Sequence, residues 1–461
     1  MSATPDRRTI AEIAPLLRRG AISPADLVRG CQDRIAARRQ LNAFVSWSAE
    51  RALADARRAE AEIASGRYRG PLHGVPVAVK DLVDVAGMAT TSGSAQPPRR
   101  PRADAPVVER LREAGAILIG KTNLHEFAFG TTSDESAFGP VRHPMDPARS
   151  AGGSSSGSAV ALAEGMCYGA VGTDTGGSIR IPAAACGVVG LKPTLAEVSC
   201  DGVVPLSETL DHVGPMARSV EDAALLWHVM TGAPVRDIAP AAGALAFGVP
   251  GPYFLEVLED AVREAFDDAR ARLIEAGHRV IDTSIRNASW TPDVYLHIVL
   301  AEAAWYHRPR LDTAPERFSP GVRLRLEMGG YVLAEDYLRA MRLRDRLAGA
   351  VDDALAGCDA LLLPALAIRA PLLGAASVEI GGSQEPVRAA MLRLTQLFNI
   401  TGHPAIALPA PSRGLPVGVQ LVALRGRTER LLAMARAAEA ALGGRTGIET
   451  GVGSDEERHG A

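Results

Sequence analysis

Short apolar runs alternate with amphipathic helical patterns along most of this chain, and that alternation restricts the folds open to it. The runs are four to six residues long and cover 75–79, 116–119, 166–171, 245–249, 360–363 and 417–422. Helical spacing fills the intervals, for example over 219–230, 260–276 and 334–356. Strands that alternate with helices build a sheet whose two faces are covered. We therefore expect an α/β fold with one central sheet, mixed but mostly parallel, covered by helices on both faces.

No internal repeat and no linker divides the 461 residues, so we expect one large, continuous domain. Residues 1–66 have helical patterns and are expected to pack on the core, which spans 67–442. The segment 308–320 is rich in proline and charge and predicts a loop between helices. The tail 443–461 is rich in glycine and charged residues, which predicts disorder.

Composition excludes several classes of protein. The net charge of −3 gives no strong attraction to nucleic acid or to an anionic membrane. The five cysteines are scattered and show no zinc spacing, which favours a reduced, cytoplasmic setting. The first residues lack the apolar core of a signal peptide, and no run approaches the roughly 18 apolar residues of a membrane span. We expect no metal, no nucleic-acid partner and no membrane partner; a homodimer is compatible with the sequence.

Two segments rich in glycine and serine are the candidates for chemistry. The first covers 151–158 and precedes an apolar helix, and the second covers 172–182 and follows the predicted strand at 166–171. A strand that ends in consecutive small residues exposes several backbone N–H groups toward one point, as in an oxyanion hole. Ser178 follows Gly176 and Gly177, so a carbonyl group could approach both its hydroxyl and these amides. Each segment taken alone is also compatible with a flexible loop.

Two other motifs are excluded by their context. Neither segment contains the Gly and Lys spacing of a phosphate-binding P-loop, and neither gives a dinucleotide-binding fingerprint. Residues 153–157 match the G-x-S-x-G nucleophile elbow, which requires a strand directly before it. The preceding segment 144–150 is polar and contains two prolines, so we interpret this match as a coincidence.

Lys80 is one of only three lysines in the chain and ends the apolar run at 75–79. Burial disfavours the charged form of an amine, so an interior lysine can titrate near pH ~7–8 and act as a base. The alternative is a solvated ammonium, paired with the adjacent Asp81. A serine nucleophile usually has a histidine as its base, but no histidine here lies in a segment typical of that role; His73 and His125 are the nearest to the two loops. A Ser–Lys arrangement is the other known solution.

Taken together, these segments resemble the amidase signature family of serine hydrolases. The likeness includes Lys80, the 152–158 loop and Thr173-Asp174-Thr175-Gly176-Gly177-Ser178-Ile179-Arg180-Ile181-Pro182. It continues through 186–194, 211–218, 399–405 and 414–421, and so spans about residues 9–442. The resemblance implies the amidase signature fold, no cofactor, and a Ser–cisSer–Lys triad.

Carried over position by position, the resemblance gives each residue a role. Ser178 would be the acylated nucleophile, and Ser154 the bridging serine, whose peptide bond to Gly153 is cis in the family. Lys80 would be the base. The backbone N–H groups of Thr175, Gly176, Gly177 and Ser178 would form the oxyanion hole.

The remaining motif residues are expected to support this site. Ser155 and Asp174 would hold the loops by hydrogen bonds, and Arg180 would brace them. Lys121 and Lys192 are interpreted as structural. Ser156 stands where many members of the family have glycine, a difference that affects the loop backbone and leaves the triad unchanged.

The resemblance implies one of two functions that members of the family perform. One is a stand-alone amidase that hydrolyses the C–N bond of a small carboxamide through an acyl-enzyme, releasing carboxylate and ammonia or an amine. The other is the catalytic glutaminase component of the amidotransferase that acts on mischarged Glu-tRNA or Asp-tRNA. That component carries a tyrosine-rich stretch, whereas residues 330–340 of this chain lack most of those tyrosines. We therefore favour the stand-alone amidase, with a pocket walled by 127–140, 305–337 and the stretch after Leu394.

Overall fold

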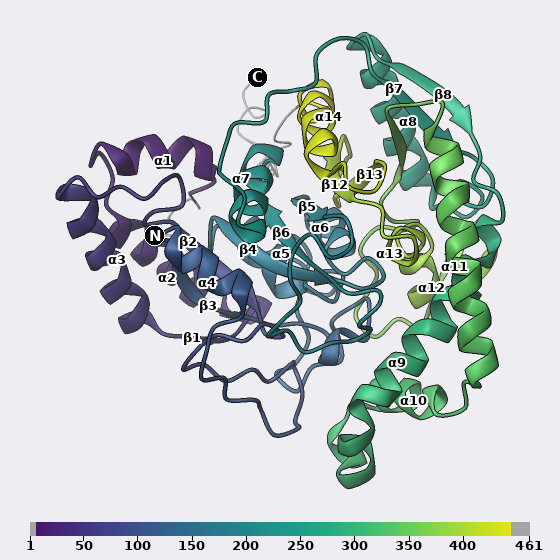
Figure 1. Cartoon of the computed structure of the whole chain (residues 1–461), viewed down its shortest axis with the longest axis horizontal. Helices are drawn as coiled ribbons and strands as arrows, with labels where there is room; N and C mark the ends of the chain where they lie inside the picture. Colours follow the sequence, from purple (N-terminus) through teal and green to yellow (C-terminus); the bar gives the residue numbers. More distant parts are fainter. Residues whose placement is uncertain (1–5, 444–461) are drawn as a thin grey trace, which may run out of the picture.

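The computed structural model describes residues 6–443, and one sheet of eleven strands runs through them (Figure 1). In spatial order its strands are β1 (Phe44–Trp47), β3 (Ile117–Thr122), β2 (Pro76–Lys80), β4 (Gly169–Asp174), β6 (His212–Ala217), β5 (Val189–Lys192), β12 (Ala405–Ala410), β13 (Val417–Val422), β9 (Ala360–Pro364), β7 (Ala246–Pro250) and β8 (Arg279–Thr283). The strands β10 (Ser377–Ile380) and β11 (Ser383–Pro386) form a separate two-stranded sheet. A single α/β unit with one mixed sheet was predicted and is confirmed.

Parallel pairing is confined to two blocks of this sheet. The strands β3, β2 and β4 are parallel to one another, as are β9, β7 and β8. The strands between the blocks, and β1 at the edge, pair antiparallel. Antiparallel pairing is therefore more extensive than the alternation of elements suggests. One reason is the short connection 411–416 between β12 and β13, since parallel neighbours need a longer crossover.

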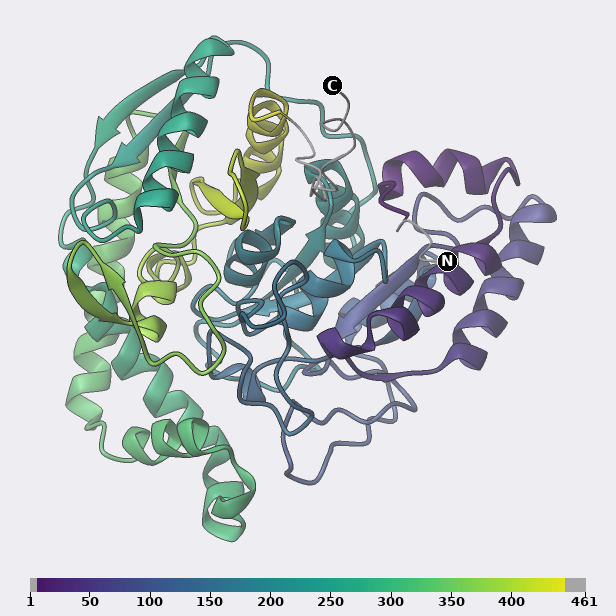
Figure 2. The same ribbon diagram turned by 180° about the vertical axis from the view of Figure 1, so that it is seen from behind.

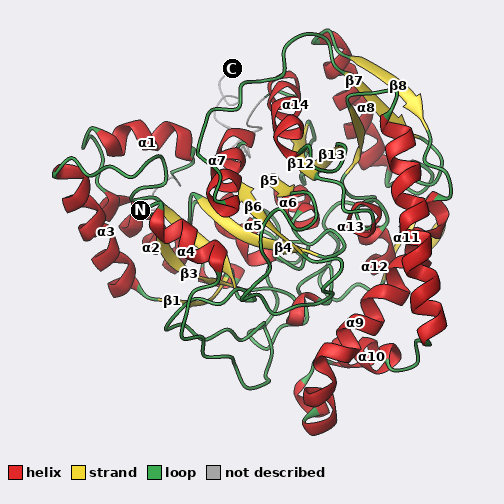
Figure 3. Ribbon diagram, viewed as in Figure 1, coloured by secondary structure: helices red, strands yellow, loops and turns green. Residues whose placement is uncertain are grey.

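Helices cover the sheet on both faces (Figure 3). The helices α5 and α6 pack against each other and against the central strands, and α7, α14 and α8 form a second connected layer. The bounds of the helices in these layers and at the N-terminal end are α1 (Ile10–Arg18), α2 (Pro24–Ala37), α3 (Ala49–Ala64), α4 (Pro106–Glu113), α5 (Ser156–Ala163), α6 (Arg180–Cys186), α7 (Val220–Thr231), α8 (Asp260–Glu275) and α14 (Thr428–Ala441). Every residue of α5 is buried, which places the start of this helix inside the protein.

A group of helices extends from one end of the sheet, as Figure 1 and the reverse view in Figure 2 show. It consists of α9 (Thr291–Thr313), α10 (Pro320–Gly329) and α11 (Ala334–Leu355), and α9 contacts both of the others. The short helices α12 (Val387–Leu392) and α13 (Leu397–Ile400) lie between this group and the sheet (Figure 1). Side chains from α9 and α12 reach the candidate site described below.

The elements predicted from the sequence agree with most of this architecture. The six apolar runs correspond to β2, β3, β4, β7, β9 and β13, although β4 begins at Gly169, three residues later than expected. The loop predicted at 308–320 is wrong over its first half, because α9 continues through Pro309 to Thr313. An Arg308–Asp312 ion pair and the Thr313 hydroxyl, which donates to the Pro309 carbonyl, support this last turn. The tail predicted to be disordered lies outside the described residues, except for its first residue.

Candidate active site

Lys80 lies at the end of β2 with its amine fully enclosed by protein. The side chain is 0% exposed, and its Nζ donates to Ser154 Oγ at 2.7 Å, Ser155 Oγ at 2.9 Å and Thr173 Oγ1 at 2.7 Å. Parallel pairing of β2 with β4 brings the ends of both strands together, so Thr173 lies beside Lys80. The two serines come from the segment that leads into α5. Three hydroxyls therefore surround the amine.

No carboxylate of residues 6–443 pairs with Lys80. Asp81 instead forms an ion pair with Lys121 at 2.8 Å, and both of these side chains are 0% exposed. Burial lowers the pKa of Lys80 to about 7, although the charges of Asp174 and Asp211 act in the opposite direction. The alternative of a solvated ammonium paired with Asp81 is therefore wrong. A lysine in this state is neutral in about half of the molecules near pH 7, as a general base requires.

The serine-rich loop holds Ser154 and Ser178 near each other through the backbone. The Gly153–Ser154 peptide bond is cis. The N–H of Ser155 donates to the Ser178 carbonyl at 3.1 Å, and the Ser155 hydroxyl donates to the Thr173 carbonyl at 3.1 Å. Between residues 6 and 443, no hydrogen bond joins the Ser154 and Ser178 hydroxyls. Lys80 and Ser154 are thus in direct contact, and Ser178 is held beside them by the loop.

A buried ion pair supports the loop that carries Ser178. The guanidinium of Arg180 donates to both carboxylate oxygens of Asp174, at 3.0 and 3.1 Å. The N–H of Ile179 and the side-chain amide of Asn399 also donate to this carboxylate. Burial would raise the pKa of Asp174, but Arg180 outweighs it and holds the pKa well below its usual range. Since Arg180 also donates to Gln420 Oε1 at 3.0 Å and to Asn399, its contacts are those of a brace.

The segment 175–178 contains four consecutive backbone N–H groups without an acceptor. No residue between 6 and 443 accepts a hydrogen bond from them, although all four residues are buried. Buried backbone donors are almost always paired, so an unpaired row of them points to a missing acceptor. This segment is the one in which the sequence predicts an oxyanion hole.

Both glycines of this segment are in close contact with side chains from distant elements. The Thr395 hydroxyl donates to the Gly176 carbonyl at 2.6 Å. A Cβ atom at Gly176 would lie 2.5 Å from Tyr295 Oη, and one at Gly177 would lie 2.2 Å from Thr395 Oγ1. Gly177 also has φ +139°, in the region that favours glycine. Only glycine fits at either position.

The histidines near the loops in sequence have other partners. The N–H of Ser133 donates to His125 Nδ1 at 3.1 Å, and the other ring nitrogen of His125 contacts Glu135 at 3.1 Å. His73 pairs with Glu62 at 3.2 Å. Within the described part of the chain, no histidine is hydrogen-bonded to the Lys80 amine or to the hydroxyls of the two candidate serines. Among the described residues, no histidine is therefore placed to act as the base for Ser178 instead of Lys80.

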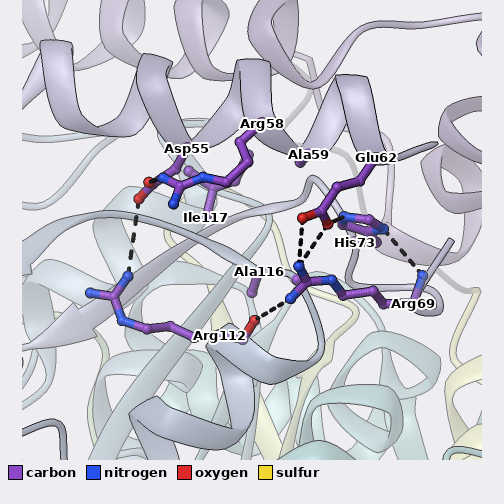
Figure 4. A pocket seen from close by; sticks show the side chains of 10 residues that line it. Asp55, Arg58, Ala59, Glu62, Arg69, His73, Arg112, Ala116 and Ile117 are labelled. Carbon is purple, nitrogen blue, oxygen red and sulfur yellow. Dashed lines mark hydrogen bonds and ion pairs between the residues drawn. The ribbon is translucent and has the colours of Figure 1, made fainter. Parts of the chain in front are cut away.

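A separate cavity of about 180 Å³ lies between α3 and α4 (Figure 4). Its lining consists of Asp55, Arg58, Ala59, Glu62, Arg69, His73, Arg112, Gly115, Ala116 and Ile117. Its charged groups are satisfied within the protein: Arg69 and His73 pair with Glu62, and Arg112 pairs with Asp104 at 2.8 Å. None of the predicted site residues lines this cavity, so it is not the place where they act.

Three residues of the site were missed from the sequence as individuals. Thr173, the third hydroxyl at Lys80, lies inside the motif already singled out but has no distinguishing feature there. Tyr295 and Thr395 touch the glycines from segments more than 100 residues away. Thr395 begins the stretch after Leu394 that was predicted as a pocket wall, whereas no sequence signal marks Tyr295. The predicted pocket wall at 127–140 contains Phe129, which lies under two arginines described below.

Two absences hold for residues 6–443. No helix there has both the length and the apolar character needed to cross a bilayer. No group of three or more His, Cys, Asp or Glu side chains there is arranged to hold a metal ion. The candidate site is accordingly described by its serine, threonine and lysine groups.

Comparison with known proteins places the chain among amidases. The family model described as Amidase matches residues 26–432. An amidase of Pseudomonas putida is 39% identical over 87% of this chain and 89% of its own length. AtzE, a subunit of the 1-carboxybiuret hydrolase of Pseudomonas sp. (strain ADP), is 37% identical over 83% of this chain and 87% of its own length. A glutamyl-tRNA(Gln) amidotransferase component from Lachnospira eligens is 35% identical, covering 83% and 87%.

Solved structures of amidases superpose closely on this chain. A crystal structure of an amidase superposes with a TM-score of 0.91 at 41% identity, covering 95% of this chain and all of that one. The peptide amidase of Stenotrophomonas maltophilia superposes with a TM-score of 0.81 at 29% identity, covering 96% and 98%. The chain therefore belongs to the amidase family, whose members carry the amidase signature.

Proposed function

We propose that this protein hydrolyses the C–N bond of a small carboxamide through an acyl-enzyme on Ser178. The products are a carboxylate and ammonia or an amine. Lys80 is the base, Ser154 relays the proton, and the N–H groups of Thr175, Gly176, Gly177 and Ser178 bind the oxyanion. The observation that carries the proposal is the row of four backbone N–H groups at the buried residues 175–178, for which no residue between 6 and 443 is an acceptor.

The reaction begins with proton transfer. Neutral Lys80 takes the proton of Ser154, which takes that of Ser178 as its oxygen attacks the amide carbonyl. The Lys80–Ser154 contact of 2.7 Å already supports the first link. The Ser154–Ser178 link forms when substrate is bound, since catalytic hydrogen bonds often tighten only in the complex. The carbonyl becomes a tetrahedral oxyanion held by the backbone amides.

The second half returns the proton and frees the enzyme. Protonated Lys80 returns the proton through Ser154 to the amide nitrogen, the C–N bond breaks, and ammonia or an amine leaves. Water then attacks the acyl-enzyme, giving up its proton along the same relay, and the carboxylate departs. Because loss of one oxyanion donor typically costs about 10²–10³ in turnover, the amides are as important as the triad.

Alanine variants at Lys80, Ser154 and Ser178 test the proposal with a panel of small amides. Each variant should lose nearly all turnover while its circular dichroism spectrum and thermal unfolding remain those of a folded protein. Arg413→Gln, at an exposed position on the 411–416 connection, serves as the matched control and should retain wild-type turnover. Wild-type turnover in Ser178→Ala would refute the assignment of the nucleophile.

A second function is supported by the relatives that are named as components of glutamyl-tRNA(Gln) amidotransferase, such as the one from Lachnospira eligens. In that case the same site would release ammonia from glutamine, and the other amidotransferase components with charged tRNA would raise the rate. Hydrolysis of simple amides at full rate by the purified chain alone contradicts this function. Low glutaminase activity that rises at least tenfold with those partners supports it.

A further inference from the structure

Arg388 carries a guanidinium without an acidic partner. The side chain is half-buried, and no residue between 6 and 443 forms a hydrogen bond or an ion pair with it. Other arginines close to it in sequence differ: Arg369 pairs with Glu259, and Arg393 donates to the Tyr253 carbonyl. A guanidinium has five N–H donors in a planar fork, so Arg388 can still accept a ligand that offers two oxygens.

The helix that carries Arg388 borders the proposed oxyanion hole. Arg388 and Leu392 are four residues apart in α12 and therefore lie on the same face of the helix. A Cβ atom at Gly176 would lie 3.1 Å from Leu392 Cδ2 and 2.5 Å from Tyr295 Oη. The face of α12 that carries Arg388 therefore lies against the same loop as the reacting serine.

A second contact joins the guanidinium to the segment that packs on the serine-rich loop. Its carbon lies 5.7 Å from the ring centre of Phe129, a side chain that is 1% exposed. The segment that follows Phe129 packs on the serine-rich loop, since a Cβ atom at Gly153 would meet the Thr131 carbonyl carbon at 2.9 Å. Arg388 is thus linked by packing to both the loop of the proposed oxyanion hole, through α12, and the loop of Ser154, through the segment that follows Phe129.

The charged side chains near Arg388 do not neutralise its positive charge. Arg325 also lies over Phe129, at 5.2 Å, but it donates to Glu135 Oε2 at 3.1 Å. That carboxylate is already engaged, because it also contacts His125 and accepts from the Gly321 N–H. Burial, with the charge of Arg325 as a further cause, lowers the pKa of Arg388 to about 10, so it remains a cation at neutral pH. Among the described residues, Arg388 is therefore a cation without a paired carboxylate.

We propose that Arg388 binds a carboxylate of the substrate, so that the preferred substrates are amides with an anionic second end, such as monoamides of dicarboxylic acids. This inference rests on the proposed function and concerns specificity. The guanidinium fork matches the two oxygens of a carboxylate, and pairing them in a partly desolvated site strengthens the contact. Arg388 acts as a substrate-binding residue and takes no part in proton transfer.

The test compares isosteric amides. Succinamate, glutaramate and adipamate are paired with butanamide, pentanamide and hexanamide, in which a methyl group replaces the carboxylate. Wild-type kcat/KM should favour one anionic member over its neutral partner by about 10- to 100-fold, the range for a hydrogen-bonded charge pair. In Arg388→Gln the ratio of kcat/KM for the anionic amide to that for its neutral partner should fall by about the same factor, mainly because KM for the anionic amide rises. The ratio for Arg388→Lys should lie between those of the wild type and Arg388→Gln. The control Arg413→Gln should keep the wild-type ratio.

A charge reversal gives an independent readout. Arg388→Asp should reverse the preference toward 5-aminopentanamide, in which a protonated aminomethyl group replaces the carboxylate of glutaramate. A wild-type enzyme that prefers the neutral amide of every pair overturns the inference, and so does an unchanged ratio in Arg388→Gln. If Ser178→Ala abolishes hydrolysis of both amides while the Arg388 variants leave the ratio unchanged, only this inference fails. Retained hydrolysis in Ser178→Ala means that the proposed function itself fails.

Discussion

The pH dependence of catalysis should report the ionisation of Lys80. The proposed reaction requires the neutral amine, so protonation of Lys80 should remove the base, and kcat/KM should fall as the pH drops through its pKa. Burial places that pKa at about 7, compared with the ordinary value of 10.5. The expected profile therefore has an acidic limb with a midpoint near pH 7 and a plateau above it.

The size of the change in kcat/KM follows from the lowered and the ordinary pKa of Lys80. With a pKa of about 7, the neutral fraction is about one-eleventh at pH 6 and about ten-elevenths at pH 8, so kcat/KM should rise about tenfold over this interval. An ordinary lysine would be neutral in only about 0.03% of molecules at pH 7. Burial thus increases the concentration of the active form about 1,500-fold at neutral pH.

The assay is kcat/KM for one amide between pH 5.5 and 9, with buffers matched in ionic strength. Asp211 provides a matched perturbation, because its negative charge raises the pKa of Lys80. In Asp211→Asn the midpoint of the acidic limb should move to lower pH, even if the plateau also falls through loss of the contact with Thr175. A wild-type profile without a limb between pH 6 and 8, or a limb unmoved in Asp211→Asn, would refute the reasoning.

The same shift has a consequence for stability. The unfolded chain binds a proton at Lys80 up to its ordinary pKa, whereas the folded chain releases it near pH 7. The contribution of Lys80 to the free energy of unfolding should therefore rise with pH between about 7 and 10.5. Relative to Lys80→Met, the wild type should gain about 2 kcal/mol between pH 7 and pH 9 in urea unfolding. A constant difference between the two proteins would contradict a lowered pKa.

Three further substitutions test the account of the loops and the core. Gly177→Ala should lower kcat more than about 100-fold, since the new methyl group meets Thr395 Oγ1 and displaces the oxyanion hole; wild-type kcat would contradict this. Lys121→Met should cost about 3–5 kcal/mol in urea unfolding, because it leaves the Asp81 carboxylate buried without a partner; a cost below 1 kcal/mol would argue against that reasoning. Ser219→Ala removes the N-cap of α7 and should cost about 1 kcal/mol in the same assay, with kcat/KM unchanged.

The fold could be predicted from the sequence where strands are continuous apolar runs. The runs that became β2, β3 and β9 are buried over their full length, so every residue in them is under the same selection for apolar character. The missed strands β5 and β6 are also buried, but glycine, proline, histidine or lysine interrupts their apolar runs, and the apolar run of β12 ends at Pro409. Tertiary pairing, which a local pattern does not contain, decides these strands.

The site could be predicted where its residues lie in short segments. The ends of β2 and β4 and the start of α5 provide Lys80, Thr173 and Ser154, and parallel pairing brings such ends together. The side chains that hold the glycines in place come from α9 and from the segment between α12 and α13. Long-range packing alone brings them to the loop, so spacing and composition could not reveal Tyr295, and they indicated Thr395 only as part of the stretch after Leu394.

The covalent intermediate tests the central claim most directly. An activated ester of a small acid, mixed with the enzyme and quenched with acid within milliseconds, should give a burst of acylated protein. Mass spectrometry of the digested protein should place the acyl group on Ser178, and both burst and adduct should be absent in Ser178→Ala. An acyl group on another residue, or turnover at the wild-type rate in Ser178→Ala, would contradict the account.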